Sequence, residues 1–184
     1  MKSFPFFNGC KEGNPQAQRL MYDHFKGILM GICRRYAKRK EEAQDILQDA
    51  FIKIFRNIHR LESDEKLEGW VKSITVRTAI DHYHKAKAHQ SMFTTITEGS
   101  SSSAGVQLLS EATDEFLLRC IGELPDGCRM TFNLFVVEGY DHAEIAKMLE
   151  VSESTSRSQL HRAKQLLQEK LKSQSLADYY EKLA

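Results

Sequence analysis

The feature that most limits the fold of this 184-residue chain is a polar segment near its middle, HQSMFTTITEGSSSSAGVQ. Serine, threonine and glycine dominate it, and the apolar periodicity of the flanking sequence stops there, which is typical of a flexible linker. On both sides, from Asn14 to about His89 and again from about Leu108, apolar residues recur at spacings of three and four, which predicts helices. We therefore expect an all-α protein with two small helical domains joined by a flexible linker. The expected domains are residues 1–89 and 111–184, and the expected linker is residues 90–110.

The composition agrees with a helical globular protein. Only three prolines and ten glycines occur, which favours helices over turn-rich sheets. The sequence has no run of eighteen apolar residues, and the apolar stretch in MKSFPFFNGC is too short for a secretory signal. We therefore expect a cytoplasmic protein without membrane insertion. The four scattered cysteines contain no CxxC pair; their spacing leaves disulfides open but favours reduced thiols and no metal site.

The net charge of +1 conceals an uneven distribution of charge. Residues 1–90 contain 17 Lys or Arg and 11 Asp or Glu, a balance of +6, and residues 91–184 contain 9 and 14, a balance of −5. Residues 153–172 nevertheless carry five basic and two acidic side chains. A nucleic-acid-binding surface is therefore expected to be local, which argues against a protein that coats DNA non-specifically.

A helix expected from Glu41 to Ile58 has two different faces. The expected core stripe, at 100° per residue, consists of Ala43, Ile46, Leu47, Ala50, Phe51, Ile54 and Ile58. The opposite side carries Asp45, Gln48, Asp49, Ile52 and Arg56. An acidic patch with an apolar centre suits the docking of a partner helix, but a solvated face with one exposed isoleucine has the same pattern. Spacing alone leaves both interpretations open.

The next expected helix, from about Leu67 to Ala88, has a polar stripe and a basic end. The stripe consists of Ser73, Arg77, Asp81 and His84, with Trp70 at its N-terminal end. Arg77 and Asp81 stand four residues apart and are expected to pair, although the basic residue comes first, which is the weaker orientation. The helix ends in DHYHKAKAH, where cations such as Lys85 accompany aromatic rings, the combination that single-stranded nucleic acid requires. A structural role fits equally well, with Trp70 in the core and the cations complementing the helix dipole.

The C-terminal part contains the pattern of a helix-turn-helix, EGYDHAEIAKMLEVSESTSRSQLHRAK. Asp141 is placed to cap the first helix and Ser152 to cap the second, with Glu150-Val151-Ser152 as the turn between them. In two short helices joined in this way, the second enters the major groove of DNA.

The second helix of this motif separates apolar from polar residues. Its expected buried seam is Leu160, Ala163, Leu167 and Leu171. Its expected exposed face is Ser154, Thr155, Ser158, His161, Arg162 and Gln165, with Arg157 on the flank. Arginine reads guanine edges, and serine and threonine reach bases or phosphates. Because this face has no carboxylate before Glu169, the pattern favours DNA binding over an ordinary solvated helix.

Nearly the whole chain, from Asn14 to Leu171, resembles the extracytoplasmic-function (ECF) group of the bacterial sigma-70 superfamily. The resemblance rests on AQDILQDAFIKIF, WVKSITVRTAIDHYHK, a polar linker, IGELP and EGYDHAEIAKMLEVSESTSRSQLHRAK, in the order of the family. It implies a transcription initiation factor that binds core RNA polymerase, melts the minus-ten promoter element and reads the minus-thirty-five element. The implied partners are the clamp helices of the largest polymerase subunit, the flap, promoter DNA and an anti-sigma factor.

The resemblance also implies roles for individual residues. Residues 1–89 correspond to sigma region 2, and residues 111–184 to sigma region 4. The implied core-polymerase contacts are Asp45, Gln48, Asp49 and Ile52. The implied minus-ten contacts are Trp70, Ser73, Arg77, His84 and Lys85, together with the preceding loop at about residues 59–68. The implied minus-thirty-five contacts are Ser152, Ser154, Thr155, Arg157, Ser158, His161 and Arg162.

Some residues depart from the family pattern. Arg77 stands where an asparagine is common and His84 where an arginine is common, so we expect altered contacts at the minus-ten element. Glu150 replaces a frequent glycine and Ser156 a frequent valine, and we expect the protein's own sequence preference to lie near these two residues.

The sequence contains no sign of catalysis. It has no P-loop, no glycine-rich nucleotide motif and no paired catalytic residues, so we expect no enzymatic activity and no cofactor. The alternative function is that of a conventional helix-turn-helix transcription regulator, which shares the C-terminal half but does not need the Asp45/Gln48/Asp49 face.

Overall fold

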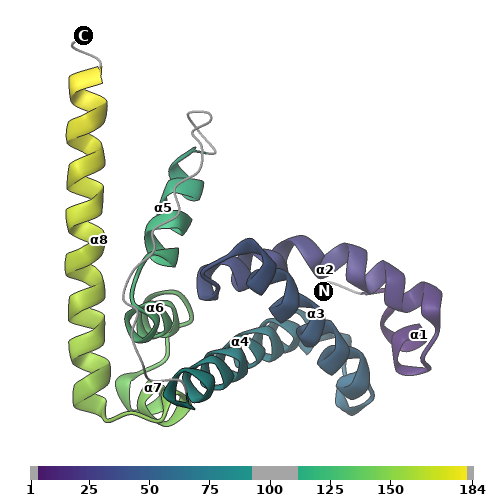
Figure 1. Cartoon of the computed structure of the whole chain (residues 1–184). Coiled ribbons are helices and arrows are strands. Elements are labelled where there is room, and N and C mark those ends of the chain that lie inside the picture. The colour runs from purple at the N-terminus through teal and green to yellow at the C-terminus, as the bar shows by residue number, and fades with distance from the viewer. Residues whose placement is uncertain (1–3, 93–111, 182–184) are drawn as a thin grey trace. The chain divides into compact units, whose positions relative to one another are not determined.

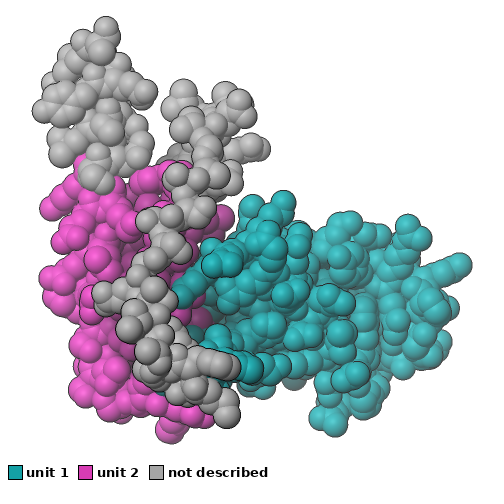
Figure 2. Space-filling model, in the orientation of Figure 1, with its two compact units in different colours: residues 1–89 teal, residues 90–184 magenta. Residues whose placement is uncertain are grey.

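The computed structural model describes residues 4–92 and 112–181, and the regular elements in these two ranges are all helical. The chain divides into two compact units, residues 1–89 and residues 90–184, coloured teal and magenta in Figure 2. The expected all-α fold with two helical domains is therefore confirmed. Of the expected linker, residues 90–92 continue the last helix of the first unit, and the remainder lies outside the described residues.

The first unit contains α1 (Phe7–Lys11), α2 (Pro15–Tyr36), α3 (Lys40–Asn57) and α4 (Leu67–Met92) (Figure 1). Two short turns of 3-10 helix, η1 (Ile58–Arg60) and η2 (Asp64–Lys66), precede α4. The side chain of Asn14 caps α2 by accepting hydrogen bonds from the backbone N–H groups of Gln16 and Ala17. All seven residues of the predicted core stripe are buried, six of them in α3 and Ile58 in η1, which confirms the predicted period.

The core of the first unit also includes residues that the helical pattern did not reveal. Phe4, Phe6 and Phe7 precede the expected start of the helices, yet each is at most 8% exposed. The ring centroids of Phe4 and Phe6 lie 5.6 and 6.3 Å from that of Phe25 in α2. Burying a phenylalanine stabilises the fold by about 1.5–3 kcal/mol. These contacts explain why α1 is ordered although five residues are too few for an independent helix.

The second unit contains α5 (Ala112–Gly122), α6 (Asp126–Phe132), one turn of π-helix η3 (Asn133–Val137), α7 (His142–Leu149) and α8 (Glu153–Glu181). Pro125 separates α5 from α6, as expected. One core cluster of this unit consists of Cys120, Ile121, Leu124, Cys128, Ala163 and Leu167. The predicted contribution of Leu160 to the buried surface of α8 is also confirmed.

A buried arginine holds the turn between α5 and α6. Arg129 is 3% exposed and donates hydrogen bonds to the carbonyl oxygens of Gly122 and Leu124, at 3.2 and 3.0 Å. It also binds the carboxylate of Asp126 at 2.7 Å. Charge-assisted hydrogen bonds of this kind compensate the cost of burying a guanidinium group. The turn therefore has one defined geometry, which places α6 for its contacts with α8.

The turn between α7 and α8 lies where the sequence predicts it and contains a strained residue. α7 begins with a capping box, in which Asp141 and Glu144 each accept a hydrogen bond from the other's backbone N–H. After α7, Glu150 adopts a left-handed conformation with φ of 54° and ψ of 50°. Such a conformation costs a residue with a β-carbon about 1–2 kcal/mol.

All four cysteines are free and buried, in agreement with the reduced thiols that the sequence favours. Burial raises the pKa of Cys10 to about 11 and that of Cys33 to about 12, because a thiolate is poorly solvated in the core. Burial also raises the pKa of Cys120 and of Cys128. The four thiols are therefore protonated at neutral pH and pack as small apolar side chains.

Replacing Glu150 with glycine is expected to stabilise the second unit by about 0.5–1 kcal/mol. Glycine adopts the positive φ without a steric cost, and this gain exceeds the extra entropy that glycine gives the unfolded chain. Urea unfolding followed by circular dichroism measures the change. The control is Glu169→Gly, at an exposed site inside α8, which is expected to destabilise the unit by about 1 kcal/mol. Destabilisation by both substitutions would contradict this account of the turn.

Candidate partner-protein and nucleic-acid interfaces

The four predicted polymerase-binding residues share one surface of α3, called here the acidic face. Asp45 and Gln48 are exposed, and Ile52 has 40% of its surface exposed. Asp49 is half-buried, because its Oδ2 atom lies 2.8 Å from Nε2 of His82 on α4. This hydrogen bond, which the sequence pattern did not reveal, orients the carboxylate while leaving 45% of the Asp49 side chain exposed.

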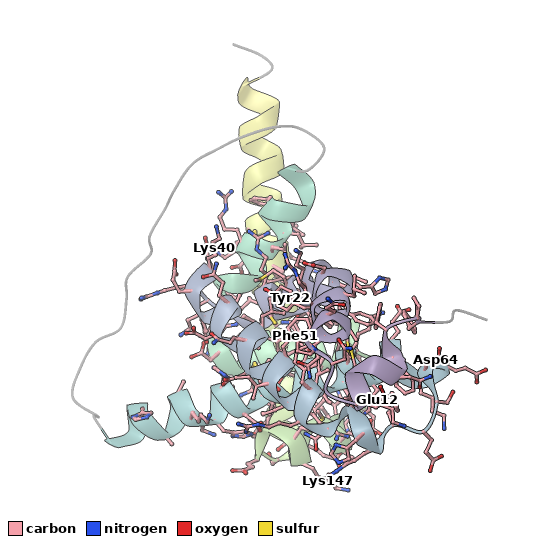
Figure 3. The ribbon with its side chains drawn as sticks, turned by 90° about the vertical axis from the view of Figure 1, so that its right-hand side faces the viewer. Glu12, Tyr22, Lys40, Phe51, Asp64 and Lys147 are labelled. Carbon is pink, nitrogen blue, oxygen red and sulfur yellow. The ribbon has the colours of Figure 1, made fainter. Side chains whose placement is uncertain are left out.

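An apolar groove adjoins the acidic face. It has a volume of about 450 Å³ and is lined by Tyr22, Met30, Gln44, Leu47, Gln48, Phe51, Ile52 and Phe55. Figure 3 shows Tyr22 of α2 beside Phe51 of α3, and their ring centroids lie 4.6 Å apart. Gln48 and Ile52 belong to both the groove and the acidic face. Carboxylates beside an open apolar groove favour a docking surface for an amphipathic helix over an ordinary solvated face.

The predicted minus-ten residues lie on α4. Trp70, Ser73 and His84 are half-buried, whereas Arg77 and Lys85 are exposed. Trp70 is therefore partly accessible to a ligand, although part of its surface packs against the protein. Spacings of three, four and seven place Trp70, Ser73, Arg77 and His84 on one side of the helix. The side of α4 that carries these residues offers an indole, a hydroxyl, a guanidinium and an imidazole together.

The expected ion pair within α4 is wrong. The carboxylate of Asp81 binds Nζ of Lys53 on α3 at 2.6 Å, and the side chain of Arg77 remains exposed. The order of charges along one helix, with the cation before the carboxylate, makes the expected pair a weak one, and the neighbouring helix supplies a closer cation. Arg77 is consequently available for another partner.

The N-terminal part of α8 carries the predicted minus-thirty-five residues on one exposed surface, called here the recognition face. Oγ of Ser152 accepts a hydrogen bond from the Thr155 backbone N–H at 3.1 Å, which confirms the predicted cap. The hydroxyl oxygens of Ser154 and Thr155 both lie 2.8 Å from Oγ of Ser152. Thr155 is half-buried, and the exposed members of this face are Ser152, Ser154, Arg157, Ser158, His161 and Arg162.

Two expectations about α8 are wrong. Leu171, predicted in the buried seam, has 44% of its surface exposed, because the core that α5 and α6 provide ends at Leu167. Ser156, expected to influence sequence preference, is fully buried, and its Oγ lies 2.9 Å from Nδ1 of His142 in α7. The ring of His142 in turn stacks on Phe135. Ser156 therefore joins the two helices of the motif and does not reach the recognition face.

A contact with α6, which the helical pattern did not reveal, also orients α8. Oε1 of Gln159 accepts a hydrogen bond from Oγ1 of Thr131 at 2.8 Å, and Thr131 is fully buried. Gly127 leaves room for the Gln159 amide, because a β-carbon at Gly127 would lie 2.4 Å from its Nε2 atom. Contacts on the inner side of α8 thus set the direction of the recognition face.

Among the described residues, no three His, Cys, Asp or Glu side chains gather in a way that could hold a metal ion. In the same part of the chain, no helix is long and apolar enough to cross a membrane.

Comparisons with known proteins match both units to one superfamily. Residues 21–89 match the family model "Sigma-70 region 2", and residues 116–167 match "Sigma-70, region 4". The first match contains the acidic face and the predicted minus-ten residues, and the second contains the whole helix-turn-helix. Each family model matches a different unit, and the two matches follow the order that the sequence resemblance implies.

Curated relatives are similar along most of their length. The chain is 22% identical to the ECF RNA polymerase sigma-E factor of Haemophilus influenzae, covering 88% of this chain and 90% of that protein. It is 24% identical to the ECF RNA polymerase sigma factor SigW of Bacillus subtilis, covering 88% and 92%. Among solved structures, the sigma factor RpoE of Bartonella quintana, crystallised with the anti-sigma factor NepR, has a similar fold. Its TM-score is 0.50 at 18% identity, over 84% of this chain and 96% of that one.

The buried position of Ser156 generates a prediction. Ser156→Ala is expected to lower the stability of the second unit by about 1 kcal/mol, because His142 loses a hydrogen-bond partner in a partly buried site, and to leave the DNA sequence preference unchanged. Urea unfolding and selection from a randomised duplex measure the two effects. The matched substitution Ser158→Ala, on the recognition face, is expected to affect DNA binding and hardly affect stability. A changed base preference in the Ser156 variant at unchanged stability would refute this assignment.

Proposed function

This chain belongs to the extracytoplasmic-function group of the sigma-70 family, and we propose that it is a dissociable specificity subunit of RNA polymerase that holds a promoter at two points. It is an initiation factor for promoter-directed transcription. In the proposed arrangement, residues 1–89 bind core polymerase and open the minus-ten element, and residues 111–184 read the minus-thirty-five element. Residues 90–110 connect the two domains. The chain acts in the cytoplasm, where the polymerase works, and performs no covalent chemistry, because the polymerase makes the RNA.

The observation that carries this proposal is the acidic face beside the apolar groove. A conventional helix-turn-helix regulator needs the recognition face but has no use for such a docking surface on a separate domain. The clamp helices of the largest polymerase subunit are the proposed occupant. In this arrangement, Asp45 and Asp49 bind basic side chains of the clamp helices, and the Gln48 amide offers hydrogen bonds to them. Ile52 and the groove receive an apolar side chain of the clamp helices.

The side of α4 that begins at Trp70 is the proposed surface for the opened minus-ten strand. Unstacked bases bind best to the faces of aromatic rings, and phosphates bind to cations. Trp70 supplies an indole ring, Arg77 and Lys85 supply exposed charge, and Ser73 and His84 add hydrogen-bonding groups between them. Arg77 is well suited to a phosphate, since Asp81 is already bound to Lys53.

The recognition face of α8 is the proposed reader of the minus-thirty-five element. The N-terminal residues of a recognition helix contact base edges in the major groove, and arginine is the commonest reader of guanine. Arg162 is exposed, and Arg157 forms an exposed ion pair with Glu153 at 3.0 Å. An exposed pair of this kind contributes about 0.2–1 kcal/mol of stability. Breaking the pair with Glu153, so that Arg157 can bind DNA, therefore costs little free energy.

An anti-sigma factor is the proposed regulator. The open apolar groove and the acidic face form a surface that core polymerase covers in the active complex. A protein that occupies the same surface keeps the chain from polymerase, and release of that protein then permits initiation. The flap of the polymerase is the proposed second contact of the core, on residues 111–184.

Separate substitutions are expected to separate the two activities. Asp45→Ala/Asp49→Ala is expected to weaken binding to core polymerase about tenfold or more and to leave duplex minus-thirty-five binding unchanged, because charge pairs at an interface contribute strongly when desolvated. The control Glu41→Ala removes an exposed carboxylate from the first turn of the same helix. Fluorescence anisotropy with labelled core polymerase measures the affinities.

The converse variant is Arg157→Ala/Arg162→Ala, which is expected to lower duplex affinity about 10- to 100-fold and to leave core binding unchanged. Lys172→Ala, an exposed cation further along α8, is its control and is expected to change duplex affinity little. Loss of both activities in either double variant would count against separate roles. A chain that binds DNA but never associates with core polymerase would be a conventional regulator.

A further inference from the structure

The segment that precedes α2 is bound to the loop that precedes α4. Phe4 and α1 lie next to residues 61–66 although 50 to 60 positions of sequence separate them. The backbone N–H of Phe4 donates a hydrogen bond to Oδ2 of Asp64 at 3.0 Å. Nζ of Lys11 donates one to the carbonyl oxygen of Leu61 at 2.9 Å. We call residues 4–11 the N-terminal clip and residues 61–66 the capture loop.

The clip is itself firmly attached to the core. Phe4, Phe6 and Phe7 are buried, and the ring of Phe4 packs against both His24 and Phe25 of α2, with centroids 5.4 and 5.6 Å apart. Nζ of Lys11 also lies 5.3 Å from the ring centroid of Phe7, which keeps the side chain over α1. The two hydrogen bonds therefore connect the capture loop to a fixed part of the fold.

The capture loop has a backbone held by hydrogen bonds and by buried flanking residues, and several of its side chains are exposed to solvent. Leu61 at its start and Leu67 just after its end are buried, and Oγ of Ser63 accepts a hydrogen bond from the Glu65 backbone N–H. The side chains of Glu62, Glu65 and Lys66 are nevertheless exposed. A loop held in this way has its backbone in one conformation before any ligand arrives, with these side chains accessible to solvent.

We propose that the N-terminal clip is a positioning element for promoter opening: through Lys11 and Phe4 it holds the capture loop in the conformation that receives an unpaired base next to α4. This inference rests on the proposed function, which assigns the opened minus-ten strand to α4, and on the family resemblance, which adds the loop before α4. A preorganised loop binds more tightly than a mobile one because its ordering cost is met during folding. Lys11 acts through the backbone of Leu61 and does not touch DNA.

The test compares Lys11→Met with the wild-type full chain, each bound to core polymerase. The ligands are a fork-junction DNA, duplex at minus-thirty-five and single-stranded at minus-ten, and a duplex that carries the minus-thirty-five element alone. Lys11→Met is expected to lower affinity for the fork DNA about fivefold, because a change of this size corresponds to the net contribution of one typical hydrogen bond. Affinities for the short duplex and for core polymerase are expected to stay unchanged, and amide hydrogen exchange of residues 61–66 to become faster.

Two controls separate positioning from charge. Lys26→Met removes an exposed cation of α2 that pairs with Asp23 and is expected to behave like wild type, and Lys11→Arg keeps a donor and is expected to restore fork affinity. The dependence of fork affinity on salt gives a further readout. A direct phosphate contact by Lys11 would lower the slope by about one in the Lys11→Met variant, whereas the positioning role predicts an unchanged slope.

A second pair of variants tests the clip if Lys11→Met does not fold. Asp64→Asn keeps an oxygen that accepts the Phe4 N–H and is expected to bind fork DNA like wild type, whereas Asp64→Ala is expected to lose affinity. Equal losses in both would overturn the proposal, as would unchanged fork affinity in Lys11→Met despite faster exchange of the loop. A wild-type complex that binds fork DNA no better than the short duplex would instead contradict the proposed function itself.

Discussion

The arrangement of the first unit depends on the fact that α3 can bury only one stripe of its surface. Packing the apolar stripe from Ala43 to Ile58 into the core turns Asp45, Gln48 and Ile52 outward. It also brings α4 alongside, where His82 and Asp81 bind Asp49 and Lys53. The acidic face and the proposed DNA-binding side of α4 are therefore surfaces of one core. In the proposed complex, a partner on the first surface and a DNA strand on the second would therefore be held by the same rigid core.

In the second unit, the inner contacts of α8 leave its outer side free for recognition. Ser156 binds His142 of α7, and Gln159 binds Thr131 of α6. The left-handed conformation of Glu150 allows the chain to turn sharply between α7 and α8. Ser152 satisfies the first turn of α8 with its own hydroxyl. Among the polar side chains that follow it, Ser154, Thr155 and Ser158 form local hydrogen bonds, and Arg157 forms only an exposed ion pair with Glu153.

Patterns within one helix were predictable from the sequence, and contacts between helices were not. Periodicity predicted the core stripe of α3 and the exposed position of Ile52, because both follow from 3.6 residues per turn. The groove at Tyr22 depends on how α2 packs on α3. Likewise, Asp81 pairs with Lys53 and not with Arg77 because of how α3 and α4 are placed in the fold. The N-terminal clip is too short to show a period, and its partners lie far away in sequence. Ser156 has a polar side chain, yet the fold buries it against α7.

Run-off transcription with purified core polymerase tests the central claim most directly. The template is a promoter selected from randomised DNA, and the only added initiation factor is this chain. The account predicts transcripts that begin at one defined position, require the chain, and become much weaker at the same chain concentration when Asp45 and Asp49 are replaced by alanine. Duplex binding without association with core polymerase, and without any transcript, would contradict it.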